Sequence, residues 1–263
     1  MRLDTLLVER GLARSRARAT ALIKDGKVKV AGIKKPKPSI DVPVDADVTL
    51  LADDHPYVSR AALKLKALAD ATGLLFKDRV VLDIGAAHGG FTQLALEYGA
   101  AHVYAVDVGT GQLDSTLKTD PKVTSYEQTD ARALAAADVP QRPHLLLCDV
   151  SFISATKVLP HLVEIFPELE EMAILVKPQF ELTPQDIGPG GVVRDKAKQY
   201  QALERLQKCL NELGFDAPTY VKSPLKGEKG NQEFMLHGRR AKPQKDDDRS
   251  DDAKAPARER RHG

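Results

Sequence analysis

The chain has 263 residues, a formal net charge of +2 and two cysteines, and 42% of its residues are hydrophobic and 29% charged. This composition excludes a wholly disordered, collagen-like or disulfide-stapled protein, and the length predicts one large domain with a smaller one. No apolar run approaches the roughly 18 residues of a membrane span, and the first residues lack the apolar core of a signal peptide. We therefore expect a cytoplasmic protein without a membrane partner. Cys148 and Cys209 lack the paired spacing of a zinc site, so we expect no metal.

The small net charge hides a strong asymmetry along the chain. Residues 1–40 hold eleven Lys or Arg against three acids, residues 41–238 hold 19 against 28, and residues 239–263 hold nine against six. These segments carry formal charges of +8, −9 and +3. A basic folded segment favours a polyanionic partner, because each neutralised phosphate releases counterions. A merely solvated basic surface is the alternative that charge alone leaves open.

The first 40 residues are predicted to fold as helix, helix, strand. Leucines from Leu3 to Leu12 share one face of a short helix, and Ser15 is a good N-cap for a second helix that ends near Asp25. Lys27 to Val30 alternate polar and apolar side chains, which is typical of a strand with one buried face. Basic side chains then crowd the second helix and the turn after it: Arg14, Arg16, Arg18, Lys24 and Lys27.

The string RLDTLLVERGLARSRARATALIKDGKVKV, from Arg2 to Val30, resembles the S4-like RNA-binding domain. The resemblance implies that this surface docks on structured RNA through shape and phosphate contacts. The residues we expect to bind RNA are Arg2, Arg14, Arg16, Arg18, Lys24 and Lys27. We place this domain and its acidic linker at residues 1–58, with a basic structural cap as the alternative reading of the surface.

Residues 59–240 are predicted to form an α/β domain that opens with a helix from about Ser59 to Ala71. Apolar strand candidates then alternate with helices, as in a mostly parallel, doubly wound sheet. The strand candidates are Val80–Ile84, Val103–Val108, Leu145–Val150 and Met172–Val176, followed by Thr219–Lys222 and Glu233–His237, the last of which is expected to run antiparallel. Residues 241–263 are charged and nearly free of large apolar side chains, and are predicted to be disordered.

A glycine-rich loop, DIGAAHGGF from Asp83 to Phe91, follows the first strand of the large domain. Gly85, Gly89 and Gly90 allow close approach of a ligand to the backbone. Ala87 replaces the second glycine of the dinucleotide pattern and no Lys-Ser/Thr pair follows, so a dinucleotide or nucleoside triphosphate is disfavoured.

Two further acids follow successive strands. Asp107 ends the second strand, where a carboxylate can hold both ribose hydroxyls, and Asp130, in the segment TDAR, follows a further strand that precedes the candidate Leu145–Val150. A ribose site without a pyrophosphate site points to S-adenosylmethionine. The pattern resembles the Rossmann-like methyltransferase fold, which implies cofactor-binding roles for Asp83, Gly85, Gly89, Gly90, Phe91, Asp107 and Asp130. For Asp130 alone, a helix N-cap before Ala131 is the alternative.

Four charged residues fall where ligands bind in such sheets, beyond the carboxyl ends of the strands. They are Lys64 on the helix before the first strand, Asp149 and Lys177 at the ends of two later strands, and Glu233 in the segment GNQEF. The set resembles the Lys-Asp-Lys-Glu tetrad of FtsJ-like ribose 2′-O-methyltransferases, in which an ammonium favours the alkoxide of the attacking hydroxyl. Surface ion pairs are the alternative for each residue alone, and Lys66 is a rival for the role of Lys64. Cys148 is expected to be a buried core residue and not a nucleophile.

An S4-like domain is combined with the strings SRAALKL, DIGAAHGGF, VDVGTGQL, DVSFIS, VKPQFE, GPGGVVRD and KGEKGNQE. This combination resembles the TlyA family, also labelled haemolysin A-like. The resemblance implies 2′-O-methylation of cytidine in 16S or 23S ribosomal RNA, with ribosomal RNA or subunits as partner and a monomer favoured. Tyr57 stands where that family often has Trp, and Thr110 where it often has Tyr. A non-catalytic ribosome-assembly factor and a membrane-active haemolysin are the rival functions.

Overall fold

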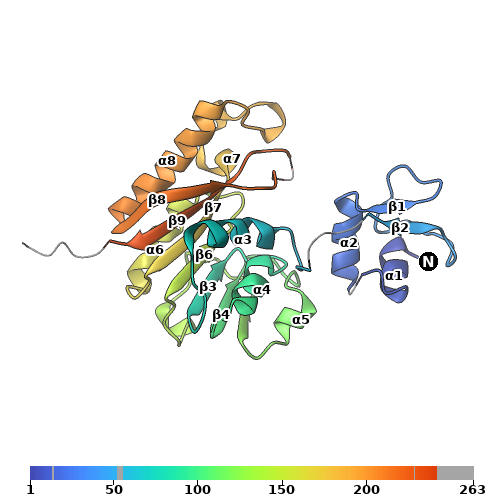
Figure 1. Cartoon of the computed structure of the whole chain (residues 1–263), viewed down its shortest axis with the longest axis horizontal. Coiled ribbons are helices and arrows are strands. Elements are labelled where there is room, and N and C mark those ends of the chain that lie inside the picture. Colours follow the sequence, from blue (N-terminus) through green and yellow to red (C-terminus); the bar gives the residue numbers. More distant parts are fainter. Residues whose placement is uncertain (14, 52–55, 228, 242–263) are drawn as a thin grey trace, which may run out of the picture.

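A computed structural model describes residues 1–13, 15–51, 56–227 and 229–241. Of the tail predicted to be disordered, only Ala241 is among the described residues. Arg14, one of the residues expected to bind RNA, also lies outside them. Figure 1 shows a small α+β part connected to a larger α/β part, with α2 of the small part turned toward the large one.

The small part buries an apolar core between two helices and a two-stranded sheet. Its elements are α1 (Leu3–Glu9), α2 (Arg16–Lys24), β1 (Val28–Val30) and β2 (Val48–Leu50). The strands pair antiparallel. Ser15 caps α2 as expected, because its Oγ accepts the Arg18 backbone N–H at 3.1 Å. Leu3, Leu6 and Leu7 of α1 are fully or almost fully buried, which confirms the apolar face expected of the first helix.

The large part is a seven-stranded sheet in the order β5-β4-β3-β6-β7-β9-β8. Its strands are β3 (Val80–Ile84), β4 (His102–Val106), β5 (Val123–Tyr126), β6 (Leu145–Cys148), β7 (Glu171–Val176), β8 (Phe215–Lys222) and β9 (Phe234–Arg240). Strands β3 to β7 pair parallel, whereas β9 runs antiparallel to both neighbours. The expected fold, with an antiparallel last strand, is confirmed.

Helices cover both faces of the sheet (Figure 1). They are α3 (Ala61–Thr72), α4 (Gly90–Glu97), α5 (Ser115–Lys118), α6 (Leu159–Ile165), α7 (Pro178–Glu181) and α8 (Lys196–Glu212). One face packs against α3 and α4, and the other against α6 and α8. The strands therefore read as continuous apolar runs, because side chains on both faces are buried.

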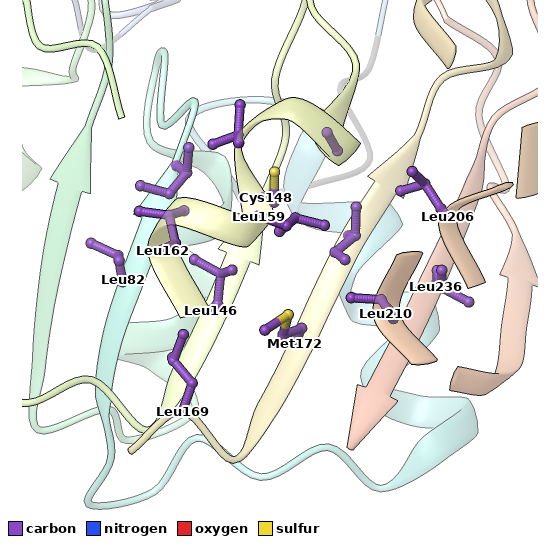
Figure 2. Packing of buried hydrophobic residues seen from close by; sticks show 14 of the residues in the cluster. Leu82, Leu146, Cys148, Leu159, Leu162, Leu169, Met172, Leu206, Leu210 and Leu236 are labelled. Atoms are coloured by element: carbon purple, nitrogen blue, oxygen red, sulfur yellow. The ribbon is translucent and has the colours of Figure 1, made fainter. Parts of the chain in front are cut away.

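Leucine is the commonest residue in the core on the α6 and α8 face. Figure 2 shows the strand residues Leu82 and Leu146 beside Leu162 of α6, and Met172 toward Leu210 of α8. All five side chains are fully buried, and each contributes roughly 1.5–3 kcal/mol of hydrophobic stabilisation. This packing holds the carboxyl ends of the parallel strands at fixed positions, and those ends carry the site described next.

Candidate active site

The loop between β3 and α4 is shaped by glycines in close contact with neighbouring backbone. Gly85 has φ +80°, and a Cβ there would lie 2.5 Å from the carbonyl oxygen of Asp149. A Cβ on Gly90 would collide with the Ser59 hydroxyl beside the start of α3. Only glycine fits these positions, so the loop after β3, the loop after β6 and α3 converge tightly at one place.

Asp107 follows β4 and is held by two backbone amides. Ala87 N–H donates to Oδ2 at 2.9 Å and Gly109 N–H donates to Oδ1 at 2.7 Å. Ala87 adopts a positive φ of 45°, which turns its amide toward the carboxylate. A carboxylate accepts about four hydrogen bonds, so Asp107 keeps acceptor capacity for a pair of ribose hydroxyls.

Asp83 is completely buried at the end of β3. Thr92 Oγ1 donates to its Oδ2 at 2.6 Å, whereas Oδ1 has no hydrogen-bond partner among the described residues. Burial, opposed by the Thr92 hydrogen bond and reinforced by the nearby Asp149 and Asp107 carboxylates, raises the pKa of Asp83 to about 7. An unpaired buried carboxylate oxygen beside the glycine loop fits a cationic ligand group such as the ammonium of S-adenosylmethionine.

The other two expected cofactor contacts lie differently. Phe91 is 2% exposed and belongs to the core that α3 and α4 cover, so it packs in the core beneath the glycine-rich loop. Asp130 is about two-fifths exposed and pairs with Arg132, which lowers the pKa of Asp130 to about 2. Asp130 is not among the residues lining the small cavity beside Asp107. Its Oδ1 also accepts the Arg132 backbone N–H at 2.9 Å, as in the capping alternative, although no helix starts there.

The four tetrad residues form two ion pairs. Lys177 Nζ lies 2.6 Å from Asp149 Oδ1, and Lys64 Nζ lies 2.6 Å from Glu233 Oε2. All four side chains are less than a fifth exposed, and Glu233 is only 3% exposed. Partial burial strengthens such pairs relative to exposed ones and fixes their geometry. Lys66, the rival for Lys64, instead pairs with Asp70 on the solvent side of α3.

The two pairs line one cleft of about 620 Å³ between the two parts of the protein. Residues of α2 form the opposite wall, including Arg18 and Lys24, and an ion pair of 3.3 Å between Arg60 and Asp25 links the walls. Among the described lining residues, seven Lys or Arg face three carboxylates, a formal charge of +4. The cleft is therefore positive although residues 41–238 carry −9.

The expected RNA-binding residues divide into two groups. Arg2 and Arg16 both pair with Asp4, at 2.7 and 3.5 Å, and Asp4 is 2% exposed. Hydrogen bonding to Arg2 lowers the pKa of Asp4 to about 2. Arg18 and Lys24 line the cleft instead, and Lys27 is half-buried at the turn before β1.

Sequence reasoning missed two residues of the cleft. Phe152 is 92% exposed, has a φ of +65°, and lies 5.2 Å from the Phe180 ring between ring centroids. Ser151 accepts a hydrogen bond from Lys177 Nζ at 2.7 Å. The string DVSF after β6 could have indicated them, because a large aromatic residue follows the strand end there and fits no apolar periodicity.

Cys148 behaves as predicted. The thiol is completely buried in the core of the large part, and burial raises its pKa to about 12. A thiol with so high a pKa is not a nucleophile at neutral pH.

Comparison with known proteins places both parts in families. The model of the FtsJ-like methyltransferase family matches residues 57–240, and that of the S4 domain matches residues 1–48. A 16S/23S rRNA (cytidine-2′-O)-methyltransferase TlyA from Mycobacterium tuberculosis is 42% identical over 236 residues, covering 89% of this chain and 88% of the relative. Hemolysin A from Brachyspira hyodysenteriae is 36% identical, covering 90% and 99%.

A solved structure of a candidate hemolysin from Streptococcus thermophilus superposes with a TM-score of 0.72 at 35% identity, covering 92% of this chain and 88% of that one. Within the described residues, no helix has the length and apolar character needed to span a membrane. The glycine loop, the two ion pairs and the matches over nearly the whole chain agree, and the chain belongs to the FtsJ-like methyltransferase family, in its TlyA branch with an N-terminal S4 domain.

Proposed function

We propose that the chain transfers a methyl group from S-adenosylmethionine to a ribose 2′-hydroxyl of cytidine in 16S or 23S ribosomal RNA. The observation that carries the proposal is the pairing of Lys177 with Asp149 and of Lys64 with Glu233 in one positive cleft. The relatives named as 16S/23S or 23S rRNA (cytidine-2′-O)-methyltransferases support the choice of substrate.

The glycine loop and two acids would hold the cofactor. Asp107 would accept the two ribose hydroxyls, and the free Oδ1 of Asp83 would pair with the amino group of the methionine part. Gly85 and Gly89, both at positive φ, would let the backbone approach the ligand closely. When bound, S-adenosylmethionine supplies a methyl carbon already activated by its sulfonium.

Lys177 has the central role in the reaction. A ribose hydroxyl has a high pKa and is a weak nucleophile, so an ammonium beside it stabilises the negative charge that develops on the oxygen. Bound S-adenosylmethionine would supply the methyl carbon to this oxygen, and its thioether would leave with the electron pair of the carbon–sulfur bond. The hydroxyl proton passes to the Asp149 carboxylate, which lines the same cleft 2.6 Å from Nζ, while Lys177 keeps its protons and stabilises the oxygen. Lys64 and Glu233 position the ribose.

The cleft also supports an RNA substrate. Arg18 and Lys24 of α2 face the tetrad across the cleft, so phosphates on either side of a target ribose would meet positive side chains from the S4 domain. Phe152 offers an exposed aromatic face at the same opening, on which a base can stack. Recognition of RNA by stacking and by backbone contacts requires both features.

The test is methyl transfer by the purified chain with labelled S-adenosylmethionine and isolated 30S or 50S subunits. We expect labelled 2′-O-methylcytidine, and we expect Lys177→Ala to lower the rate by at least about 100-fold with unchanged binding of S-adenosylhomocysteine. Lys208→Ala, on the exposed face of α8, is the matched control. Absence of labelling with both subunits would favour the rival function of a non-catalytic assembly factor, and a wild-type rate for Lys177→Ala would overturn the mechanism.

A further inference from the structure

Lys177 contacts a charged side chain and an uncharged side chain, and the uncharged one orients its N–H bonds. The Asp149 carboxylate lies 2.6 Å from Nζ and balances its charge, but an ion pair holds the position of a charge better than the direction of each N–H bond. Among the described residues, the side-chain hydrogen bond that Lys177 donates goes to Ser151 Oγ, at 2.7 Å.

We propose that Ser151 is a positioning residue for Lys177, a role that rests on the proposed function. With one N–H donated to Ser151 and the charge held by Asp149, the ammonium can present another N–H to the attacking hydroxyl in the cleft. The Phe180 ring, with its centroid 6.0 Å from Nζ, borders the same group. Ser151 thus selects one rotation of the ammonium without contacting the reacting atoms.

The backbone around Ser151 is built to hold that hydroxyl in place. The segment that holds Ser151 runs from Asp149 to Phe152. The Asp149 N–H donates to the Ile84 carbonyl at 2.8 Å, and the Asp149 carbonyl lies so close to position 85 that only glycine fits there. The segment then turns at Phe152, which takes a positive φ of 65° although it is not glycine. A non-glycine residue in this region requires support from its surroundings, and the Phe180 ring 5.2 Å away supplies it. Ser151, just before this turn, has its hydroxyl 2.7 Å from the same Lys177 Nζ that contacts Asp149.

The change Ser151→Ala removes the acceptor but leaves both charges. Hydrogen bonds from charged donors and small displacements of catalytic groups each affect rates strongly, so we expect the single-turnover rate at saturating cofactor and ribosomal subunits to fall about 10-fold to 100-fold. The apparent affinities for S-adenosylhomocysteine and for the subunits are expected to stay within about 2-fold. Ser151 is exposed, so Ser151→Thr has room for its methyl group and is expected to restore most of the rate.

The experiment measures single-turnover methyl transfer, cofactor affinity and thermal unfolding of the full chain for Ser151→Ala, Ser151→Thr and Lys177→Ala. Ser115→Ala, an exposed serine of α5 outside the cleft, is the matched control and is expected to behave as wild type. A wild-type rate for Ser151→Ala, or a loss confined to subunit affinity, would overturn the positioning role. A slow Ser151→Thr variant that unfolds normally would also count against it. If Lys177→Ala itself reacts at the wild-type rate, the proposed function fails instead, so the two failures are distinguishable.

Discussion

The buried carboxyl of Asp83 makes the stability of the large part depend on pH in an unusual direction. Its pKa is about 7 in the folded chain, against an ordinary value of 3.8 for an Asp carboxyl. Between these two pH values the folded chain holds a proton that the unfolded chain has released. The contribution of Asp83 to stability is therefore fully present below about pH 4 and is lost as the pH rises through about 7.

The size of the effect follows from the shift in pKa. A difference of about 3 pH units at about 1.36 kcal/mol per unit corresponds to roughly 4 kcal/mol over the whole window. Asp83→Asn keeps an oxygen that can accept the Thr92 hydroxyl hydrogen bond but cannot ionise. The variant is therefore expected to gain stability relative to the wild type as the pH rises.

The assay is urea unfolding followed by circular dichroism at several pH values between 4.5 and 8. Comparing the variant with the wild type cancels other titrating groups, including Glu181, whose pKa burial also raises. We expect the difference in unfolding free energy between variant and wild type to change by a few kcal/mol in favour of Asp83→Asn across this range. A difference that stays constant within about 0.5 kcal/mol, close to the resolution of such measurements, would refute the reasoning.

Four further outcomes are expected. Gly85→Ala places a methyl group 2.5 Å from the Asp149 carbonyl oxygen at a positive φ and should destabilise the chain by about 3 kcal/mol or more, which thermal unfolding would reveal; an unchanged midpoint would contradict the fit. Asp107→Ala should weaken S-adenosylhomocysteine binding at least about 10-fold in calorimetry, because the ribose hydroxyls and two partly buried amides all lose their acceptor; equal affinity would place the ribose elsewhere. Asp4→Asn should lower the free energy of unfolding by about 2 kcal/mol and speed amide exchange in α1. The pKa of Asp4 is lowered, so its contribution to stability is present above pH 4 and is lost as the pH falls through about 2. Unaltered exchange would show that the pairs of Asp4 with the arginines contribute nothing. Lys24→Ala should reduce the slope of log affinity for ribosomal RNA against log salt by somewhat less than 1 if the side chain neutralises one phosphate, and an identical slope would remove it from the RNA surface.

Local patterns were sufficient for most of the fold. The strand Val80–Ile84 has the predicted bounds, because a continuous apolar run between turn residues leaves little choice of ends. The strand Phe215–Lys222 starts four residues before its predicted beginning, since Asp216 and Pro218 weaken its apolar pattern and its pairing with β9 compensates. Strand β5 (Val123–Tyr126) has only four half-buried residues at the sheet edge, so it carries a weak signal.

The sequence by itself determined the chemistry available to this protein. Asp83 and Asp107 lie at the carboxyl ends of buried strands, and the backbone between them requires glycines. The cofactor loop can therefore be predicted from residues that are close together in the chain. Lys64 and Glu233 are 169 positions apart, and no pattern could state that they touch. Only the packing of α3 against β9 decided that contact.

The same is true of the charge. A sum over residues 41–238 is negative, yet the cleft is positive, because tertiary structure gathers Lys64, Lys177, Lys226 and Lys229 at one opening and α2 closes it from the other side. Electrostatic potential depends on where charges lie in space, so net charge along the chain cannot reveal it. The hydrogen bond between Lys177 and Ser151 is of the same kind: the residue types are in the sequence, but the meeting of two strand ends puts them together.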